Sequence, residues 1–254
     1  MKYIVMALML ILCAMTTISV HASEQPVLNC GNSYFTFKRD TEEFDNKIDA
    51  MSYQSLVSTS GRNALHESTV HNFQLGYYAL ACDQGNDASR VAQKLWDLGI
   101  PDGDVLLMNV LGHLQRLDYQ GAYRVYRYDS LTVSQDPISS YWKYLALLIV
   151  KKQLCQYNMS KSFPLVCLKD PLLYIKEVRR QLHSTPSNCE IIVSLFDGKH
   201  PDLKKLRDLP SQVQASRVLI DYIDSGVPEF TMVVREYARL QYVHMHIKST
   251  DNAG

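Results

Sequence analysis

The sequence has no excess of charge of either sign. Its 254 residues include 26 Lys and Arg and 26 Asp and Glu. A nucleic-acid-binding protein neutralises phosphates with a clustered basic face, so this balance argues against a nucleic-acid partner. Hydrophobic residues make up 46% of the chain and charged residues 20%, which is ordinary globular usage. The composition therefore excludes collagen-like, low-complexity and fully disordered chains.

The common motifs of enzyme chemistry are also missing. The sequence contains no Gly-x-Ser-x-Gly elbow, no phosphate-binding loop and no dinucleotide fingerprint, so we expect no cofactor. It has no Cys-x-x-Cys pair, which argues against a zinc knuckle and a thioredoxin-like redox pair. Ser194, Asp197 and His200 lie close in sequence, but a catalytic triad is assembled in space. We interpret them as part of a turn at Asp197 and Gly198.

Long hydrophobic runs are confined to the N-terminus. Lys2 precedes an uncharged stretch over residues 4–20, and Ala22 ends a small-residue site suited to signal-peptidase cleavage. We interpret residues 1–22 as a secretory signal peptide, with a retained membrane anchor as the alternative. The remaining chain has no segment long enough to span a bilayer. The sequence thus predicts an exported protein, periplasmic or secreted, with no integral span in its mature part.

Five cysteines follow the signal peptide: Cys30, Cys82, Cys155, Cys167 and Cys189. An exported protein keeps disulfides, so we expect two bonds and one odd thiol. The sequence does not determine the pairing, although short spacing favours Cys155–Cys167 or Cys167–Cys189. Free cysteines buried as small apolar side chains are the open alternative.

The chain is predicted to be mainly α-helical, with a small N-terminal β element. The aromatic residues 34–37 favour a short hairpin or edge strand, so residues 23–60 are expected to form a β-containing segment. Apolar periodicity, caps and turns predict a helical-repeat region over residues 61–160 and a mainly helical region over 161–254. Residues 242–248 alternate as an edge strand would, although a continuous helix from Phe230 is also open.

A spacing of 36 residues recurs within the helical region. Leu75-Gly76 and Leu111-Gly112 each fall in a first helix, and Leu147-Leu148 lies at the next interval. A turn and a second helix follow each of the first two pairs. The second helix carries Ala88, Ala92 and Trp96 in the first unit, and Ala122 and Tyr126 in the next. Helical hairpins of this length bury their apolar faces by stacking on one another.

These residues resemble the Sel1-like and tetratricopeptide repeats. In those families a Leu-Gly pair in the first helix precedes a Gly-Asp-Tyr turn and an Ala-containing second helix; here Asp118, Tyr119, Gly121 and Ala122 follow Leu111-Gly112. The second helices are two residues out of register between the units, and the third lacks its glycine. The resemblance covers residues 70–150 and implies a short α-solenoid that binds another protein.

Tyrosine is abundant, with 16 in the chain, and it is enriched at protein interfaces. If the repeats stack, Tyr119, Tyr123, Tyr126 and Trp96 are candidates for a partner-binding groove, unless these rings simply pack between helices. By analogy with repeat folds, we expect a non-catalytic scaffold or adaptor for another protein of the cell envelope, within a secretion, surface-organelle or virulence system.

The alternative function is a metal-dependent hydrolase that uses His66, Glu67 and His71. Zinc hydrolases place two histidines four residues apart on one helix face beside a glutamate that activates water. The two histidines here are five residues apart, a spacing similar to the His-Glu-x-x-x-His of the dipeptidyl peptidase III family, with Glu236 as a loose third ligand. His244 and His246 form a second candidate pair if the tail is a strand, against a solvated edge as the simpler interpretation.

Overall fold

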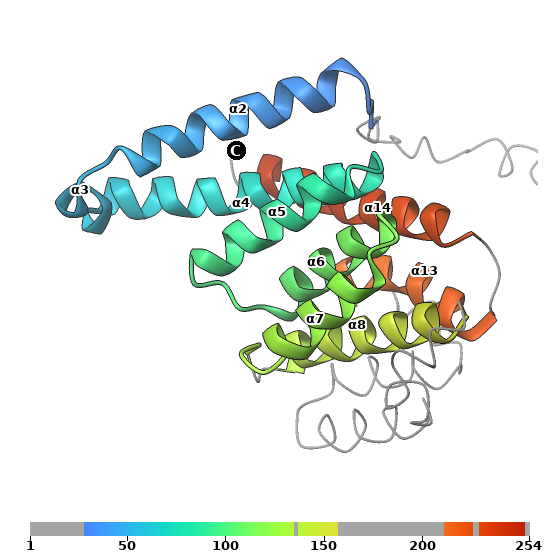
Figure 1. The fold of residues 1–254 in the computed structure, drawn as a ribbon. Coiled ribbons are helices and arrows are strands. Elements are labelled where there is room, and N and C mark those ends of the chain that lie inside the picture. The colour runs from blue at the N-terminus through green and yellow to red at the C-terminus, as the bar shows by residue number, and fades with distance from the viewer. Residues whose placement is uncertain (1–27, 135–136, 157–210, 226–228, 252–254) are drawn as a thin grey trace, which may run out of the picture.

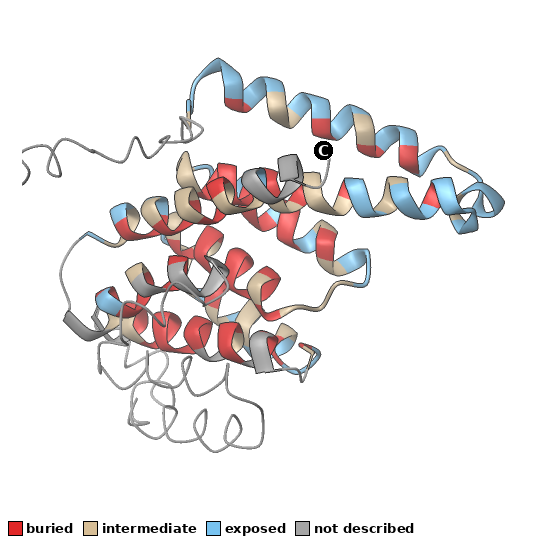
Figure 2. Ribbon diagram, turned by 180° about the vertical axis from the view of Figure 1, so that it is seen from behind, coloured by how far each residue is buried: buried red, intermediate tan, exposed pale blue. Residues whose placement is uncertain are grey.

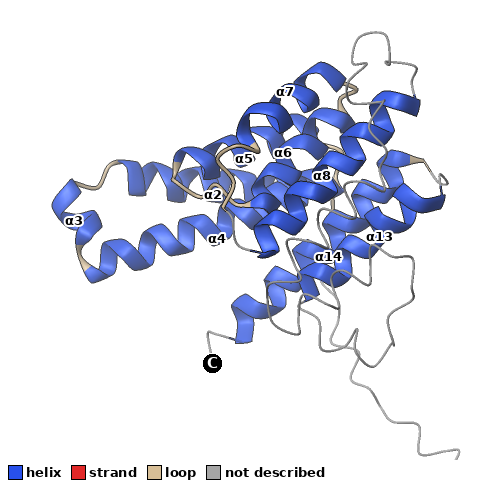
Figure 3. Cartoon of the chain, turned by 90° about the horizontal axis from the view of Figure 1, so that it is seen from below, coloured by secondary structure: helices blue, strands red, loops and turns tan. Residues whose placement is uncertain are grey.

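The structure is a computed structural model that describes residues 28–134, 137–156, 211–225 and 229–251. Every regular element in these ranges is an α-helix (Figure 3). The helices are α2 (Asn32–Asp49), α3 (Tyr53–Val57), α4 (Thr59–Ala81), α5 (Gly85–Asp97), α6 (Gly103–Gln115), α7 (Tyr119–Asp129), α8 (Pro137–Gln156), α13 (Ser211–Ser225) and α14 (Phe230–Asp251). The expectation of a mainly α fold is confirmed.

The middle of the chain consists of two helical hairpins followed by a single helix. α4 packs against α5, α5 against α6, and α6 against α7, while α6 also contacts α4 and α8. α14 packs against α4 and reaches α6, and α13 packs against α14 and α8 (Figure 1). The C-terminal pair of helices therefore covers α4, α6 and α8.

The core is centred on α6, which has neighbours on most sides. Leu106, Leu107, Met108 and Leu111 of this helix have no exposed surface, and buried residues concentrate on the stacked helices rather than on α2 (Figure 2). A helix that is apolar around most of its circumference belongs inside a helical assembly. The same hydrophobic cluster continues from Tyr34 in α2 to Ala238 in α14.

Side-chain caps and a glycine set several helix boundaries. The Ser58 hydroxyl accepts a hydrogen bond from the Gly61 amide at 3.1 Å at the start of α4. The Asp118 carboxylate does the same for Gly121 at 2.8 Å at the start of α7. Gly99 follows α5 with a φ of +81°, a backbone conformation that glycine adopts without steric cost.

The predicted N-terminal β element at residues 34–37 is wrong, because these residues lie in α2. The buried positions of that helix are Tyr34, Thr41, Asp45 and Ile48, whose spacing follows the helical repeat. Aromatic side chains favour strands only where they pack on a sheet. Here Tyr34 packs edge-on against Tyr78 of α4, with ring centroids 5.3 Å apart.

The edge strand expected at residues 242–248 is also wrong, and the alternative of a continuous helix from Phe230 is correct. Val234, Tyr237, Ala238 and Gln241 of α14 are buried, and they recur at helical spacing. The alternation that suggested a strand is short, whereas the helical pattern extends over the whole segment. None of the described helices is long and apolar enough to cross a membrane.

Candidate functional site

A charged cleft lies between α2, α4 and α5. It has a volume of about 140 Å³, and Leu75 and Val91 contribute apolar side chains to its wall. Its other lining residues are polar or charged: Lys38, Glu42, Asp45, Asn72, Asp87, Arg90 and Lys94. The cleft thus has three cationic and three anionic groups around a small apolar surface.

The charged residues follow the two helices in matching order. Lys38, Glu42 and Asp45 are spaced at one turn of α2, and Asp87, Arg90 and Lys94 are spaced at one turn of α5. Lys38 pairs with Asp87, and Asp45 pairs with Lys94, so the numbering rises in the same direction along both helices. The two helices run parallel, as Figure 1 shows. Residues of opposite charge on the two helices line the cleft at three successive levels.

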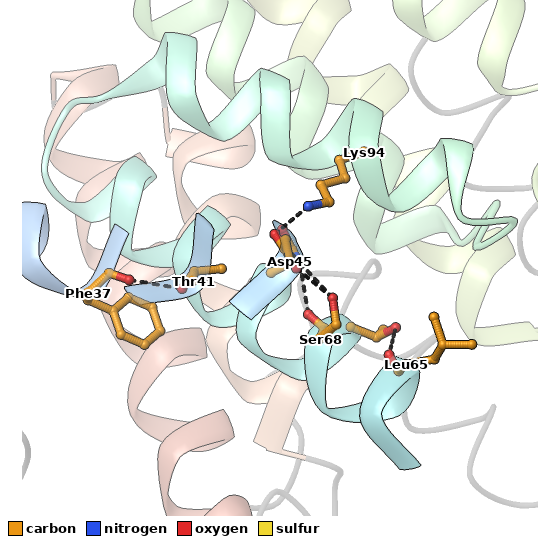
Figure 4. A network of polar contacts seen from close by, with 8 residues as sticks. Phe37, Thr41, Asp45, Leu65, Ser68 and Lys94 are labelled. Atoms are coloured by element: carbon orange, nitrogen blue, oxygen red, sulfur yellow. Dashed lines mark hydrogen bonds and ion pairs between the residues drawn. The ribbon is translucent and has the colours of Figure 1, made fainter. Parts of the chain in front are cut away.

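Asp45 is the centre of a buried polar network (Figure 4). It is 5% exposed and accepts hydrogen bonds from the Ser68 hydroxyl at 2.6 Å and from the Asn72 amide at 3.2 Å. The Lys94 ammonium forms an ion pair with its other oxygen. The two hydrogen bonds and the ammonium group replace the water that this buried carboxylate has lost.

Asp87 closes the opposite end of the cleft. It accepts a hydrogen bond from the Tyr34 hydroxyl at 2.6 Å and pairs with the Lys38 ammonium at 3.0 Å. Burial by itself raises the pKa of Asp87, but the hydrogen bonds from Tyr34 and Lys38 and the charges of Lys38 and Arg90 lower it below its ordinary value. Asp87 is therefore a stable anion that holds α2 against α5.

A disulfide joins Cys30, directly before α2, to Cys82 at the end of α4. Beside it, the Tyr78 hydroxyl donates a hydrogen bond to the Asn29 carbonyl at 2.6 Å. This pair was one of the open alternatives. Short spacing favoured Cys155–Cys167 or Cys167–Cys189. Cys167 and Cys189 lie outside the described residues, and the Cys155 side chain is not described. The disulfide ties the start of α2 to the end of α4.

The residues of the hydrolase alternative are not brought together. His66 and Glu67 of α4 are exposed, whereas His71 packs edge-on against Phe44 at a centroid distance of 5.3 Å and against Phe37 at 6.4 Å. Glu236, the loose third ligand, lies on α14 and pairs with Arg239 at 2.8 Å. Within the described parts of the chain, no group of three His, Cys, Asp or Glu residues is arranged to hold a metal ion.

The second histidine pair is separated by the helical form of the tail. His244 and His246 are two residues apart on α14, which places them on different sides of a helix, whereas a strand would place them on one face. His246 stacks on the ring of Tyr242 at a centroid distance of 6.0 Å. The Ser194, Asp197 and His200 group lies outside the described residues.

The four aromatic candidates for partner binding, Tyr119, Tyr123, Tyr126 and Trp96, are partly buried and pack against the hydrophobic core. This placement agrees with the alternative that the rings pack between helices. Their role in binding a partner stays a prediction.

Sequence reasoning missed the cleft, although the sequence carried a signal for it. Charges of opposite sign recur at one-turn spacing in two segments, residues 38–45 and 87–94. Only the contact between the two helices shows that these charges face each other.

Comparison with family models, with curated proteins and with solved structures gives no match to this chain. The resemblance to Sel1-like and tetratricopeptide repeats accordingly rests on the residues quoted above, and it stays a prediction.

Proposed function

We propose that this protein is an exported, non-catalytic scaffold or adaptor that binds another protein of the cell envelope. In this proposal α4–α5 and α6–α7 are two units of a short solenoid, and α8 begins a third. The proposed setting is a secretion, surface-organelle or virulence system, by analogy with other proteins built from helical repeats.

The packing of two glycines supports the repeat. Gly76 in α4 and Gly112 in α6 are the glycines of the two Leu-Gly pairs, 36 residues apart. A Cβ at Gly76 would lie 3.2 Å from Val91 and would overlap Met108, and a Cβ at Gly112 would lie 2.6 Å from the Gly85 carbonyl oxygen. Both glycines thus allow a neighbouring helix to approach closely, which is the role of small residues in stacked helical hairpins.

The observation that carries the proposal is a projecting arm, which we define as α3 with the adjoining halves of α2 and α4. The arm extends beyond the other helices (Figure 1). At its tip Tyr53 is 79% exposed and Val57 is 51% exposed. Exposed aromatic and apolar side chains gathered on a protruding element are typical of protein-binding surfaces.

The disulfide between Cys30 and Cys82 supports export, because such bonds form and persist in oxidising compartments. The face shared by α4, α6 and α8 is covered by α13 and α14, which leaves the arm as the better surface for a partner.

Affinity purification of the mature chain, residues 23–254, from its native cell envelope tests the proposal. We expect a stoichiometric protein partner that is retained by wild type and lost from a Tyr53→Ser, Val57→Ser variant. The matched control is Tyr128→Ser, which removes a tyrosine that is 60% exposed on α7 and should leave the partner bound.

Metal analysis of the same samples addresses the hydrolase alternative. Stoichiometric zinc together with an activity that Glu67→Gln abolishes would refute the scaffold function. A partner that binds the arm variant as tightly as wild type would refute the role of the arm.

A further inference from the structure

The cleft between α2 and α5 is held open at a fixed width by its two ends. The Lys38–Asp87 and Asp45–Lys94 ion pairs join the helices at points seven residues apart on each helix, about 10 Å at the rise of an α-helix. The buried network around Asp45 and the Tyr34 hydrogen bond to Asp87 fix these ends further. The opening between them is therefore part of the folded structure.

The middle level of the cleft is different, because its two charges do not pair. Glu42 on α2 and Arg90 on α5 are exposed and line the cleft from opposite walls. Neither forms a hydrogen bond or an ion pair with another residue in the described part of the chain, although the charge of Arg90 acts on Asp87 and that of Glu42 acts on Tyr34. A carboxylate on one wall and a guanidinium on the other thus stay available to a ligand.

The surface between these charges determines what fits. Leu75 and Val91 are buried apolar residues that line the cleft, and the Asn72 amide lies beside them. A volume of about 140 Å³ is smaller than the 300–1,000 Å³ usual for drug-sized ligands. These features suit a small ligand that carries one charge of each sign and a short apolar part.

We propose that the cleft binds a free aliphatic α-amino acid. Its ammonium group pairs with Glu42, its carboxylate pairs with the planar guanidinium of Arg90, and its side chain contacts Leu75 and Val91. Glu42 lies in the half of α2 that belongs to the arm, but the residues proposed to bind the partner, Tyr53 and Val57, lie on α3 and do not line the cleft.

Isothermal titration of the full mature chain with L-leucine tests the site. We expect saturable binding, and at least tenfold weaker binding of two analogues that each lack one charge, 3-methylbutylamine and 4-methylpentanoate. The dipeptide Leu-Leu tests whether the site takes a free amino acid or the end of a peptide. Its ammonium and carboxylate groups lie too far apart to pair with Glu42 and Arg90 at the same time.

Two cleft variants and two controls test whether Glu42 and Arg90 bind L-leucine. Glu42→Gln and Arg90→Gln should each weaken L-leucine binding at least tenfold, while Glu43→Gln and Arg62→Gln, exposed charges outside the cleft, should leave it unchanged. Circular dichroism melts of each variant confirm that the fold is retained.

Three results would overturn the proposal. The first is the absence of saturable L-leucine binding up to about 10 mM. The second is a Glu42→Gln or Arg90→Gln variant that binds L-leucine as tightly as wild type does. The third is Leu-Leu, or either singly charged analogue, binding as tightly as L-leucine. Loss of the envelope partner would leave this site intact, so the two proposals fail separately.

Discussion

Gly85 at the start of α5 and Gly112 near the end of α6 lie directly against each other. A Cβ at Gly85 would come within 2.5 Å of the Gly112 carbonyl oxygen, and a Cβ at Gly112 would come within 2.6 Å of the Gly85 carbonyl oxygen. Two helix backbones approach this closely only where neither has a side chain. The contact joins the first helical hairpin to the second.

Gly112→Ala should therefore destabilise the protein by about 2 kcal/mol, because the added methyl group overpacks the α5–α6 contact. Urea unfolding followed by circular dichroism measures the loss. Gly99→Ala is the control variant, because nothing lies within 4 Å of the Cβ position of Gly99. Only the positive φ of this residue disfavours alanine, so we expect a loss of about 1 kcal/mol in unfolding free energy. A Gly112→Ala variant as stable as wild type would contradict the close packing of these helices.

Removing the disulfide should cost about 4 kcal/mol of unfolding free energy, the chain-entropy value for the 52-residue separation of Cys30 and Cys82. The measurement is urea unfolding of the Cys30→Ser, Cys82→Ser variant. The same variant in excess dithiothreitol is the control, because any further loss of stability on reduction comes from bonds other than Cys30–Cys82. A difference under about 1 kcal/mol between the variant and oxidised wild type would show that the bond does not constrain the unfolded chain as expected.

Asp45→Ala should destabilise the protein by about 3 kcal/mol. The substitution leaves the buried Ser68 hydroxyl without its acceptor and the Asn72 amide with only Ser68 as its partner. It also removes the partner of Lys94. Glu43→Gln, two residues away on the exposed side of α2, is the matched control and should change stability by less than about 0.5 kcal/mol. Chemical denaturation of both variants decides whether the network stabilises the attachment of α2.

Alkaline pH should destabilise the protein above about pH 10. Burial is the largest cause that raises the pKa of Tyr34, Tyr77, Tyr141 and Tyr237 in the folded state. A raised folded pKa gives stability that is complete below the unfolded pKa and is lost as pH rises above it, by up to about 1.4 kcal/mol per pH unit for each tyrosine.

Urea unfolding from pH 8 to pH 11 measures this loss. Tyr34→Phe should flatten the alkaline dependence by the share of one tyrosine, while Tyr53→Phe, which alters an exposed ring on α3, should leave the slope unchanged. An unchanged free energy of unfolding up to pH 11 would contradict the burial of these hydroxyls.

The helical character of residues 59–156 was predictable because its signals are local. Apolar periodicity, the Asp118 cap and the glycine at residue 99 act within a few residues of the helices they define. The two predicted strands were wrong because the local patterns that suggested them are short. Residues 34–37 and 242–248 resemble strands in isolation, and packing against α4 selects the helix in both cases.

The composition, the even charge balance, the 36-residue spacing of the Leu-Gly pairs and the number of cysteines are properties of the sequence alone. Tertiary structure decided which cysteines pair, which tyrosines are buried and which charges meet across the cleft. Each of these depends on residues far apart in the chain: about 50 residues separate Cys30 from Cys82 and Lys38 from Asp87. Local patterns determine the helices over residues 59–156, but only the packing of the helices determines which side chains come into contact.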